Sequence, residues 1–276
     1  MFEAEISVIW WGKLHGEFVL EMAFGSVLKE WRGQRRMSQL DLGLEANVSA
    51  RHISFLETGR AKPSRPMVLH LCETLSVPRG ARNSFLNAAG FAPVYKSRTL
   101  DEKDMAHVRA AVDWTLSRHD PFPAMALDRH WVIVKANRAA QMLLVGAGLS
   151  EGDSLLTAMA DPAIMTETLE NWQEVAQHMA TRLRTESEYL GGDEVLEKAA
   201  AGLTKALEID GFHQTKELPA VVPARYYASG TVLTFFSTLA QFGSAEDIAL
   251  AELKIELMFP ADDQTRDTLF KMADAS

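Results

Sequence analysis

Two short helical patterns lie only three residues apart near one end of the chain, and this spacing limits the possible folds more than any other feature. Ser38 can cap the first helix and Ser49 the second, in which Ile53 and Leu56 point inward. The turn between them, Ala46-Asn47-Val48, contains an asparagine, which tolerates the left-handed conformation that a tight turn needs. Two helices joined in this way, the second opening with exposed polar groups, have the geometry of a helix-turn-helix.

Further helical patterns flank this pair and predict a five-helix, all-α domain over residues 23–92. Phe24, Leu28 and Trp31 recur at helical spacing before the pair, and Leu71 and Phe85 mark the inner faces of two later helices. The segment is also basic. Residues 23–91 contain ten Lys or Arg and five Asp or Glu, whereas residues 92–276 have a net charge of −11 and the whole chain −9. A basic domain followed by an acidic one is the asymmetry expected when the first part contacts a polyanion.

The motifs in this domain point to a known family. Met37-Ser38-Gln39, Val48-Ser49 and the run from Ile53 to Arg60, with Pro63-Ser64 behind it, resemble the phage-repressor-like (XRE) family of DNA-binding domains. The resemblance covers residues 24–90, although Gly43 and Asn47 stand where the family usually has alanine and glycine. It implies that the helix after Ser49 enters the major groove of double-stranded operator DNA.

The resemblance also implies roles for single residues. Gln39 would contact a phosphate and brace the recognition helix, and Arg51 would read a base, since a guanidinium can bond both acceptors of a guanine. Arg60 and Lys62 would contact phosphates or, alternatively, be part of a solvated loop. Glu57 would be structural. The full set of predicted DNA-binding residues is Gln39, Ser49, Ala50, Arg51, His52, Ser54, Phe55, Arg60 and Lys62.

Residues 105–276 have a mixed pattern, which gives the whole chain an α+β fold class. After a linker at 93–104, a helix over 105–118 precedes a hairpin of two short apolar runs around Asp128-Arg129-His130. Further predicted helices cover 137–144, 163–189 as one long helix, 193–208 and 262–273, and predicted strands cover 220–228, 231–242 and 248–259. In the last strand Leu253 and Ile255 alternate with Lys254 and Glu256, as in a half-buried antiparallel strand.

This second pattern resembles the MmyB-like ligand-binding domain of bacterial repressors, a relative of the PAS sensor fold. The resemblance covers residues 105–260 and rests on the run Ala136–Ala140 directly after a strand, on Asp161-Pro162, and on Asn171-Trp172 with Arg182 downstream. It implies a pocket for a small apolar, fatty-acid-like ligand between the sheet and the long helices. The predicted ligand-binding residues are Trp131, Asn137, Trp172, Met179, Arg182, Tyr226 and Phe235.

Each of these residues also has a structural interpretation. The aromatic side chains and Met179 can be plain core, and Arg182, on the long helix, can belong to a solvated helix face. Asn137 can cap the helix that follows it.

Several function classes are excluded by the sequence. It has no apolar run long enough for a membrane span, and its single cysteine, Cys72, forms no disulfide framework or CxxC zinc site. No HxxxH or HExxH spacing, phosphate-binding loop or GxSxG motif is present, so we predict no metal, no cofactor and no enzyme activity. We place the protein in the cytoplasm. Residues 1–22 form an extension with an apolar run from Ile6 to Trp11, so either Met22 is the true start or the extension packs on the body or on a dimer partner.

These observations predict a homodimeric, DNA-binding transcriptional regulator. Its operator binding would respond to a small apolar ligand held at 105–276, the region that would also dimerise. In the alternative, the C-terminal domain is only a dimerisation or protein-interaction scaffold.

Overall fold

The computed structural model describes residues 23–209, 221–228, 230–243 and 246–274 of the protein. The chain divides into two compact units, Met1–Val94 and Tyr95–Ser276, each of which is described separately. The expectations for residues 1–22, including a start at Met22, lie outside the described residues.

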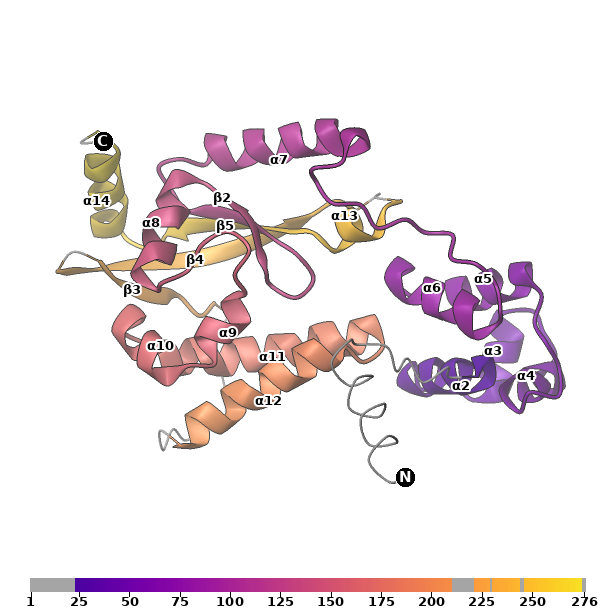
Figure 1. Ribbon diagram of the computed structural model, residues 1–276. Helices are drawn as coiled ribbons and strands as arrows, with labels where there is room; N and C mark the ends of the chain where they lie inside the picture. Colours follow the sequence, from indigo (N-terminus) through magenta and orange to yellow (C-terminus); the bar gives the residue numbers. More distant parts are fainter. Residues whose placement is uncertain (1–22, 210–220, 229, 244–245, 275–276) are drawn as a thin grey trace, which may run out of the picture. The chain divides into compact units, whose positions relative to one another are not determined.

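The first unit is all-α, as predicted. Its described helices are α2 (Phe24–Gln34), α3 (Gln39–Glu45), α4 (Ala50–Glu57), α5 (Arg65–Thr74) and α6 (Arg79–Ala88) (Figure 1). Leu28, Ile53, Leu71 and Phe85 are fully buried in its core. The five helices therefore close around one apolar centre with their inner faces as the periodicity predicts.

Local signals fix where the two central helices begin. The Ser38 hydroxyl accepts from the Asp41 N–H at 3.1 Å, while the Asp41 carboxylate accepts from the Ser38 N–H at 2.8 Å, a complete capping box. Ser49 caps α4 by accepting from the His52 N–H at 3.2 Å. Asn47 has φ 51°, so the turn between α3 and α4 uses the left-handed conformation expected of it.

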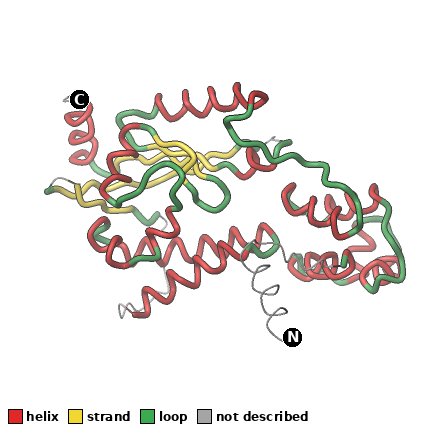
Figure 2. Tube along the Cα trace, viewed as in Figure 1, coloured by secondary structure: helices red, strands yellow, loops and turns green. Residues whose placement is uncertain are grey.

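The second unit is built on a five-stranded antiparallel sheet with the order β2-β1-β5-β4-β3 (Figure 2). The strands are β1 (Ala124–Leu127), β2 (Ile133–Ala136), β3 (Ala224–Ala228), β4 (Thr231–Gln241) and β5 (Lys254–Pro260). The described helices are the short η1 (Lys103–Met105), α7 (Ala106–Arg118), α8 (Arg138–Gly146), α9 (Leu155–Met159), α10 (Pro162–Thr168), α11 (Trp172–Leu190), α12 (Glu194–Ile209), α13 (Ile248–Glu252) and α14 (Asp263–Asp274). The α+β class is confirmed.

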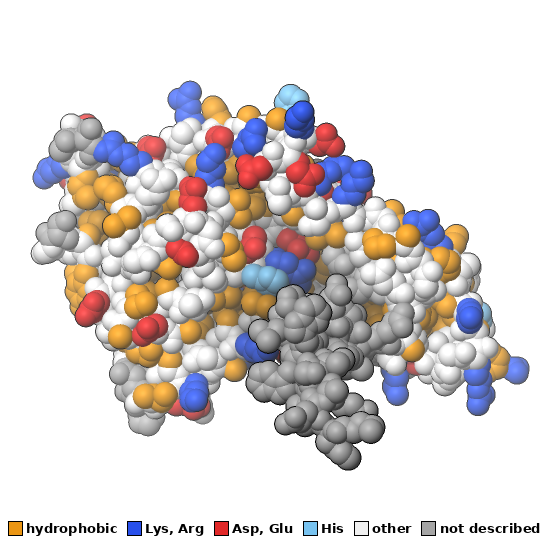
Figure 3. All heavy atoms as spheres, viewed as in Figure 1, with side chains coloured by type: hydrophobic (Ala, Val, Ile, Leu, Met, Phe, Trp, Pro, Cys, Tyr) orange, Lys and Arg blue, Asp and Glu red, His pale blue; other side chains and the backbone are white. Residues whose placement is uncertain are grey.

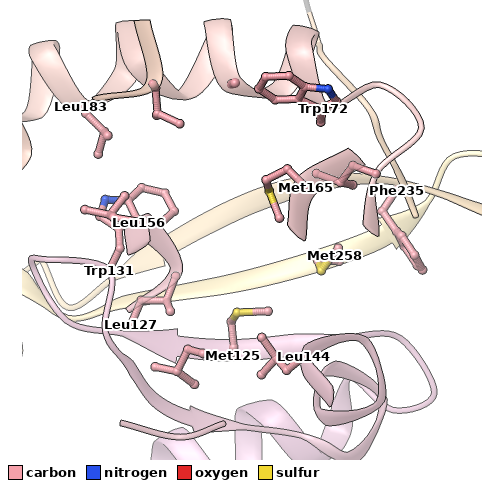
Figure 4. Close-up of a cluster of buried hydrophobic side chains, with 14 of the residues drawn as sticks. Met125, Leu127, Trp131, Leu144, Leu156, Met165, Trp172, Leu183, Phe235 and Met258 are labelled. Carbon is pink, nitrogen blue, oxygen red and sulfur yellow. The ribbon is translucent and has the colours of Figure 1, made fainter. Parts of the chain in front are cut away.

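Helices cover both faces of this sheet (Figure 1). On one face α7 packs through Val112 and Leu116 against Ala126 and Ile255. On the other face lie α11 and α12, and between them and the sheet is the larger apolar cluster drawn in Figure 4. The sheet is thus the middle of three layers.

The prediction of one long helix over 163–189 is wrong, because the two helices α10 and α11 occupy this range. Leu169, between α10 and α11, is extended (φ −121°, ψ 124°) and forms an antiparallel bridge with Tyr226. The Asn171 side chain continues this pairing by accepting from the Arg225 N–H at 3.0 Å and donating to the Pro223 carbonyl at 2.8 Å. The break lets the chain pair with β3, and no local signal marks it.

The strand predicted over 248–259 is also corrected. Its first part is the helix α13, capped by Asp247, whose carboxylate accepts from the Ala249 N–H at 3.0 Å. Only the second part is the strand β5, and this strand is not half-exposed. Lys254 and Met258 are buried under α11, and Leu253 and Ile255 are buried under α7. A central strand between two helical layers has no solvent face.

Part of the stretch predicted as a linker lies against the second unit. The Lys96 carbonyl accepts from the Ile248 N–H at 2.8 Å, and the Arg98 N–H donates to the Asp247 carboxylate at 3.2 Å. From Lys96 onward, the chain is therefore anchored to the start of α13.

Candidate functional site

The helix pair α3–α4 is closely packed at its turn. The Val48 N–H donates to the Gly43 carbonyl at 2.7 Å, and a Cβ on Gly43 would lie 2.6 Å from the Val48 carbonyl oxygen. Only glycine allows this approach, which accounts for its place in the middle of α3.

A buried carboxylate holds α4 in position. Glu57, whose side chain is only 3% exposed, accepts from Arg32 Nε at 2.6 Å, Arg32 Nη2 at 3.1 Å and Gln39 Nε2 at 2.7 Å. Arg32 also donates to the Met37 carbonyl at 2.6 Å. This network ties α2, α3 and the end of α4 together, and it agrees with the bracing role expected of Gln39 and the structural role expected of Glu57.

The predicted DNA-binding residues lie around α4 and the loop after it. Ser49, Arg51, Arg60 and Lys62 are exposed, whereas Ala50, His52, Ser54 and Phe55 are partly exposed. The Arg51 guanidinium lies 5.2 Å from the centre of the Phe55 ring, a cation–π contact that limits its freedom. Lys and Arg side chains stand out along the edge of the first unit in Figure 3. Such a capped helix with protruding cations can enter a groove of DNA.

In the second unit, a cluster of charges surrounds the buried Trp131. The Glu186 carboxylate on α11 accepts from Trp131 Nε1 at 3.1 Å, Arg182 Nε at 2.9 Å and Lys254 Nζ at 2.8 Å. The Arg182 guanidinium and the Lys254 ammonium lie 5.0 Å and 4.5 Å from the centre of the Trp131 ring. Two cations and one indole therefore hold one carboxylate at the edge of the apolar cluster.

Burial and hydrogen bonding have opposite effects on the pKa values of Glu186 and Lys254. Burial alone would raise the pKa of Glu186, but the hydrogen bonds from Arg182 and Lys254 outweigh it and lower the pKa. Burial lowers the pKa of Lys254, although its contact with Glu186 opposes this. Glu186 is thus held as a carboxylate by the two cations.

A cavity of about 370 Å³ opens beside this cluster. Glu186 and Lys254 line it together with Arg129, Tyr189 and Glu252. Arg129 contacts both Glu252, at 3.4 Å, and the carboxylate that caps α12, while its buried Nε has no hydrogen-bond partner among the described residues. Burial raises the pKa of Glu252, although the Arg129 charge opposes this. Both cations of the cavity, Arg129 and Lys254, are therefore close to carboxylates.

Six of the seven predicted ligand-binding residues lie between the sheet and α11. Trp131, Trp172 and Phe235 are buried in the large apolar cluster, where Trp172 comes from α11 and Phe235 from the sheet (Figure 4). Met179 and Tyr226 pack against this cluster. Arg182 joins Trp131 at one end. The side chains that the sequence assigned to one pocket are thus neighbours along one core.

Asn137 lies apart from them. Its side-chain oxygen accepts from the Ala140 N–H at 3.0 Å, capping α8, and from the Ala124 N–H at 2.9 Å. Its amide donates to the carbonyls of Leu116 and Phe122 at 3.2 Å and 2.8 Å. Every polar site of this side chain is used to join α7, β1 and α8.

Comparisons with known proteins agree with these two units. Residues 108–271 match the MmyB-like transcription regulator ligand binding domain, and residues 23–85 match a Helix-turn-helix domain. The chain belongs to the MmyB-like transcription regulators. It is accordingly a DNA-binding regulator with a ligand-binding domain, and its families are not enzyme families.

Two other comparisons do not contribute to the assignment of this MmyB-like regulator. A solved structure described as an RNA-binding Light-Oxygen-Voltage Receptor is 15% identical to it, with a TM-score of 0.23 over 100% of this chain and 69% of that one. No curated protein matches the sequence. In the described part of the chain, no helix is long and apolar enough to cross a membrane.

Sequence reasoning missed three residues of this MmyB-like regulator that organise its two sites. Arg32 orients α4, and Glu186 and Lys254 form the charge cluster beside Trp131. The only signal for Arg32 was the structural role already expected of Glu57. For Lys254 the alternating pattern of the strand predicted a solvent-facing side chain. Its partner Glu186 is 68 residues away in the sequence, so no local pattern could reveal the contact.

Proposed function

We propose that this MmyB-like regulator binds a two-fold symmetric operator as a homodimer in the cytoplasm, and that a small apolar, carboxylate-bearing ligand in the second unit changes its affinity for DNA. The observation that supports the ligand chemistry is the Glu186 carboxylate, which Arg182 and Lys254 hold at the end of a large apolar cluster. A site that binds one carboxylate beside apolar side chains fits a fatty-acid-like molecule.

The ligand would compete with the protein's own carboxylate. Arg182 offers a guanidinium that can bond a carboxylate in two places, and it already lies over the Trp131 ring. If the ligand head group displaced Glu186, the apolar chain would extend along α11 toward Met179, Trp172 and Phe235. Displacement of Glu186 would free α11 from Lys254 on the sheet, which gives the ligand a way to shift that helix.

Such a ligand affects DNA binding only as far as its affinity differs between two states of the protein, commonly by about 1–3 kcal/mol. Linkage is reciprocal, so operator DNA must change the ligand affinity by the same factor.

Titration calorimetry of the full chain with saturated fatty acids of medium and long chain length tests the ligand. We expect saturable binding, weaker binding of the matching alcohols, and an altered dissociation constant when the operator is present. Arg182→Gln should weaken the acid and leave the alcohol unchanged, whereas Arg184→Gln, on the exposed side of the same helix, should change neither. If no acid binds, the second unit is a scaffold and the ligand part of the proposal is wrong.

Selection of bound duplexes from a random pool tests the DNA side. We expect inverted half-sites whose centres lie about one helical turn, or a multiple of it, apart. Enrichment of a single asymmetric half-site would contradict a dimeric regulator.

A further inference from the structure

A carboxyl group of β5, that of Glu256, faces the apolar cluster between the sheet and α11. Glu256 lies between Lys254, which contacts α11, and Met258, which is buried in the cluster, so strand alternation places its side chain on the same face. Its cross-strand neighbours, Met125 on β1 and Leu239 on β4, also pack in this cluster. Among the described residues no cation forms an ion pair with Glu256, so its carboxyl group lies in apolar surroundings without a charged partner.

A tyrosine hydroxyl lies near this carboxyl group. Tyr226 on β3 packs against the same cluster, where its ring lies edge-on to the Phe235 ring at a centroid distance of 6.0 Å. Burial raises the pKa of Tyr226 and the charge of Glu256 raises it further, so the two groups are close enough to interact. Burial also raises the pKa of Glu256, although a hydrogen bond with Ser237 and two nearby cations oppose this. The Tyr226 hydroxyl forms no hydrogen bond with another residue in the described part of the chain.

The antiparallel register of β4 and β5 places Glu256 in the path of the proposed ligand. Gln241 and Lys254 are paired across the two strands and both line the cavity, and Glu256 belongs to the next pair on the same face. Such pairs are about 7 Å apart along a strand. Figure 4 shows Trp131, which the Lys254 ammonium contacts, and Trp172 at opposite ends of the cluster. A chain that extends from the head-group site toward Trp172 therefore passes Glu256 several carbons after the carboxylate.

The second half of β4 has an open edge in the described structure. β3 pairs only with Thr231–Phe235 of β4, whereas β5 pairs with β4 as far as Gln241. On the face toward α11, the side chains of Ser237 and Gln241 are exposed and that of Leu239 is partly buried. A ligand can therefore reach Glu256 from this edge of the sheet.

We propose that Glu256 and Tyr226 bind a hydroxyl group on the acyl chain of the ligand, which makes the ligand a hydroxylated fatty acid. The inference rests on the ligand site of the proposed function and narrows its ligand class. A hydroxyl both donates and accepts, so it can pair with a phenol and with a carboxyl group in either protonation state. An unsubstituted chain would cover the same two groups and leave them without a partner, which lowers its affinity.

Titration calorimetry of the full chain tests this selection. The ligands are palmitic acid and a series of hydroxypalmitic acids that differ only in the position of the hydroxyl. We expect an isomer whose hydroxyl lies several carbons from the carboxylate to bind at least about tenfold more tightly than palmitic acid, because its hydroxyl satisfies both groups. Isomers with the hydroxyl near the far end of the chain should bind no more tightly than palmitic acid.

Two substitutions on β3 form a matched pair. Tyr226→Phe removes only the hydroxyl and should reduce the preference for the hydroxylated acid by at least about threefold. Tyr227→Phe is the control, since Tyr227 is the next residue of the strand, points to the other face and is 51% exposed. It should keep the full preference.

Substitutions of the carboxyl group give a second readout. Glu256→Met should abolish the preference and bind palmitic acid at least as tightly as wild type, because no polar group is then left uncovered. Glu256→Gln, whose amide still donates and accepts, should keep most of the preference. Retained binding of palmitic acid shows that a variant is folded. If Glu256→Met binds neither acid, the comparison of Tyr226→Phe with Tyr227→Phe decides.

The outcomes separate this inference from the proposed function. If palmitic acid binds and no hydroxylated isomer binds more tightly, the inference is overturned and the ligand class of the proposed function stands. A preference that persists in both Tyr226→Phe and Glu256→Met also overturns the inference, because other groups then bind the hydroxyl. If neither palmitic acid nor any hydroxypalmitic acid binds, the ligand part of the proposed function is wrong, and this inference is wrong with it.

Discussion

The two units of this regulator place their cations differently. In the first unit Arg51, Arg60 and Lys62 are exposed, and the buried ion pair Arg32–Glu57 holds the recognition helix. In the second unit Lys254 is only 5% exposed, and it faces Glu186 under the sheet. Exposed cations suit a polyanion that approaches from outside, whereas buried cations suit a carboxylate held inside. The cations of the first unit thus face outward, whereas Lys254 of the second unit holds the protein's own Glu186.

The largest effect is expected when the buried ion pair of the first unit loses its cation. Arg32→Met leaves the Glu57 carboxylate buried with Gln39 alone, which we expect to destabilise the unit by about 3 kcal/mol or more. Hydrogen exchange measured across a urea series would show peptides of α2–α6 losing protection early, while peptides of β1–β5 stay unchanged.

Lys29→Met is the matched control, since Lys29 is exposed on the same helix and should have little effect. Arg32→Met/Glu57→Leu, which removes both charges, should recover part of the loss. Equal unfolding of the Lys29 and Arg32 variants would mean that the ion pair does not hold α4.

The contrast also explains what could be predicted from sequence. The helices of the first unit follow from local signals, such as the Ser38 capping box and the left-handed Asn47, which act within a few residues. In the second unit, the break at Leu169 depends on its bridge to Tyr226, and the burial of Lys254 depends on Glu186. These partners are far away in the sequence, so periodicity alone predicted one long helix and a half-exposed strand.

The candidate sites divide in the same way. The DNA-binding residues were assigned from a motif whose spacing is local, and all nine lie on α3, α4, the N-cap of α4 or the loop that follows. The ligand-binding residues were assigned from a looser resemblance. It found the aromatic side chains between the sheet and α11, but it included Asn137, whose amide serves the backbone, and missed Glu186.

Removal of one exposed cation should act on recognition rather than on folding. Arg51→Ala should lower discrimination between operator and scrambled duplex by about 1–3 kcal/mol, because a bidentate contact to guanine carries sequence information. Arg60→Ala should instead weaken both duplexes equally, since a phosphate contact is independent of sequence. Competition binding at fixed salt measures both. If Arg51→Ala keeps full preference for the operator, another residue reads the base.

Acid should reveal the buried carboxylate of the second unit. Because the pKa of Glu186 is lower in the folded protein, its contribution to stability is present above its usual pKa of 4.5 and is lost as pH falls through the folded value. Glu186→Gln should therefore lower the free energy of unfolding by about 1–2 kcal/mol at pH 7. The difference from wild type should shrink below about pH 4.5.

Wild type and Glu186→Gln must be compared directly, because the pKa values of other buried acids are raised in the folded protein. Burial raises the pKa of Glu252 and Glu256, so these two favour the folded state at low pH. The difference between the urea unfolding free energies of the two proteins, measured between pH 3 and 7 by far-ultraviolet circular dichroism, isolates the Glu186 contribution. A constant difference across this range would show that Glu186 is not held as a carboxylate by Arg182 and Lys254.

The smallest expected effect concerns Ser49, which is one of the predicted DNA-binding residues and also caps α4. Ser49→Ala removes the acceptor for the His52 N–H, and loss of an N-cap costs about 1 kcal/mol of stability. Ser49→Asp keeps a cap of equal quality and adds a negative charge at the end of the helix that would face phosphate. If Ser49 lies at the DNA, Ser49→Asp should retain wild-type stability yet bind every duplex more weakly, with a smaller salt dependence. If Ser49 only caps the helix, Ser49→Asp should bind DNA like wild type, and the affinity of Ser49→Ala should change only through its unfolded fraction. Thermal unfolding and salt-dependent DNA binding of the two variants together decide whether this serine serves the fold alone or also the interface.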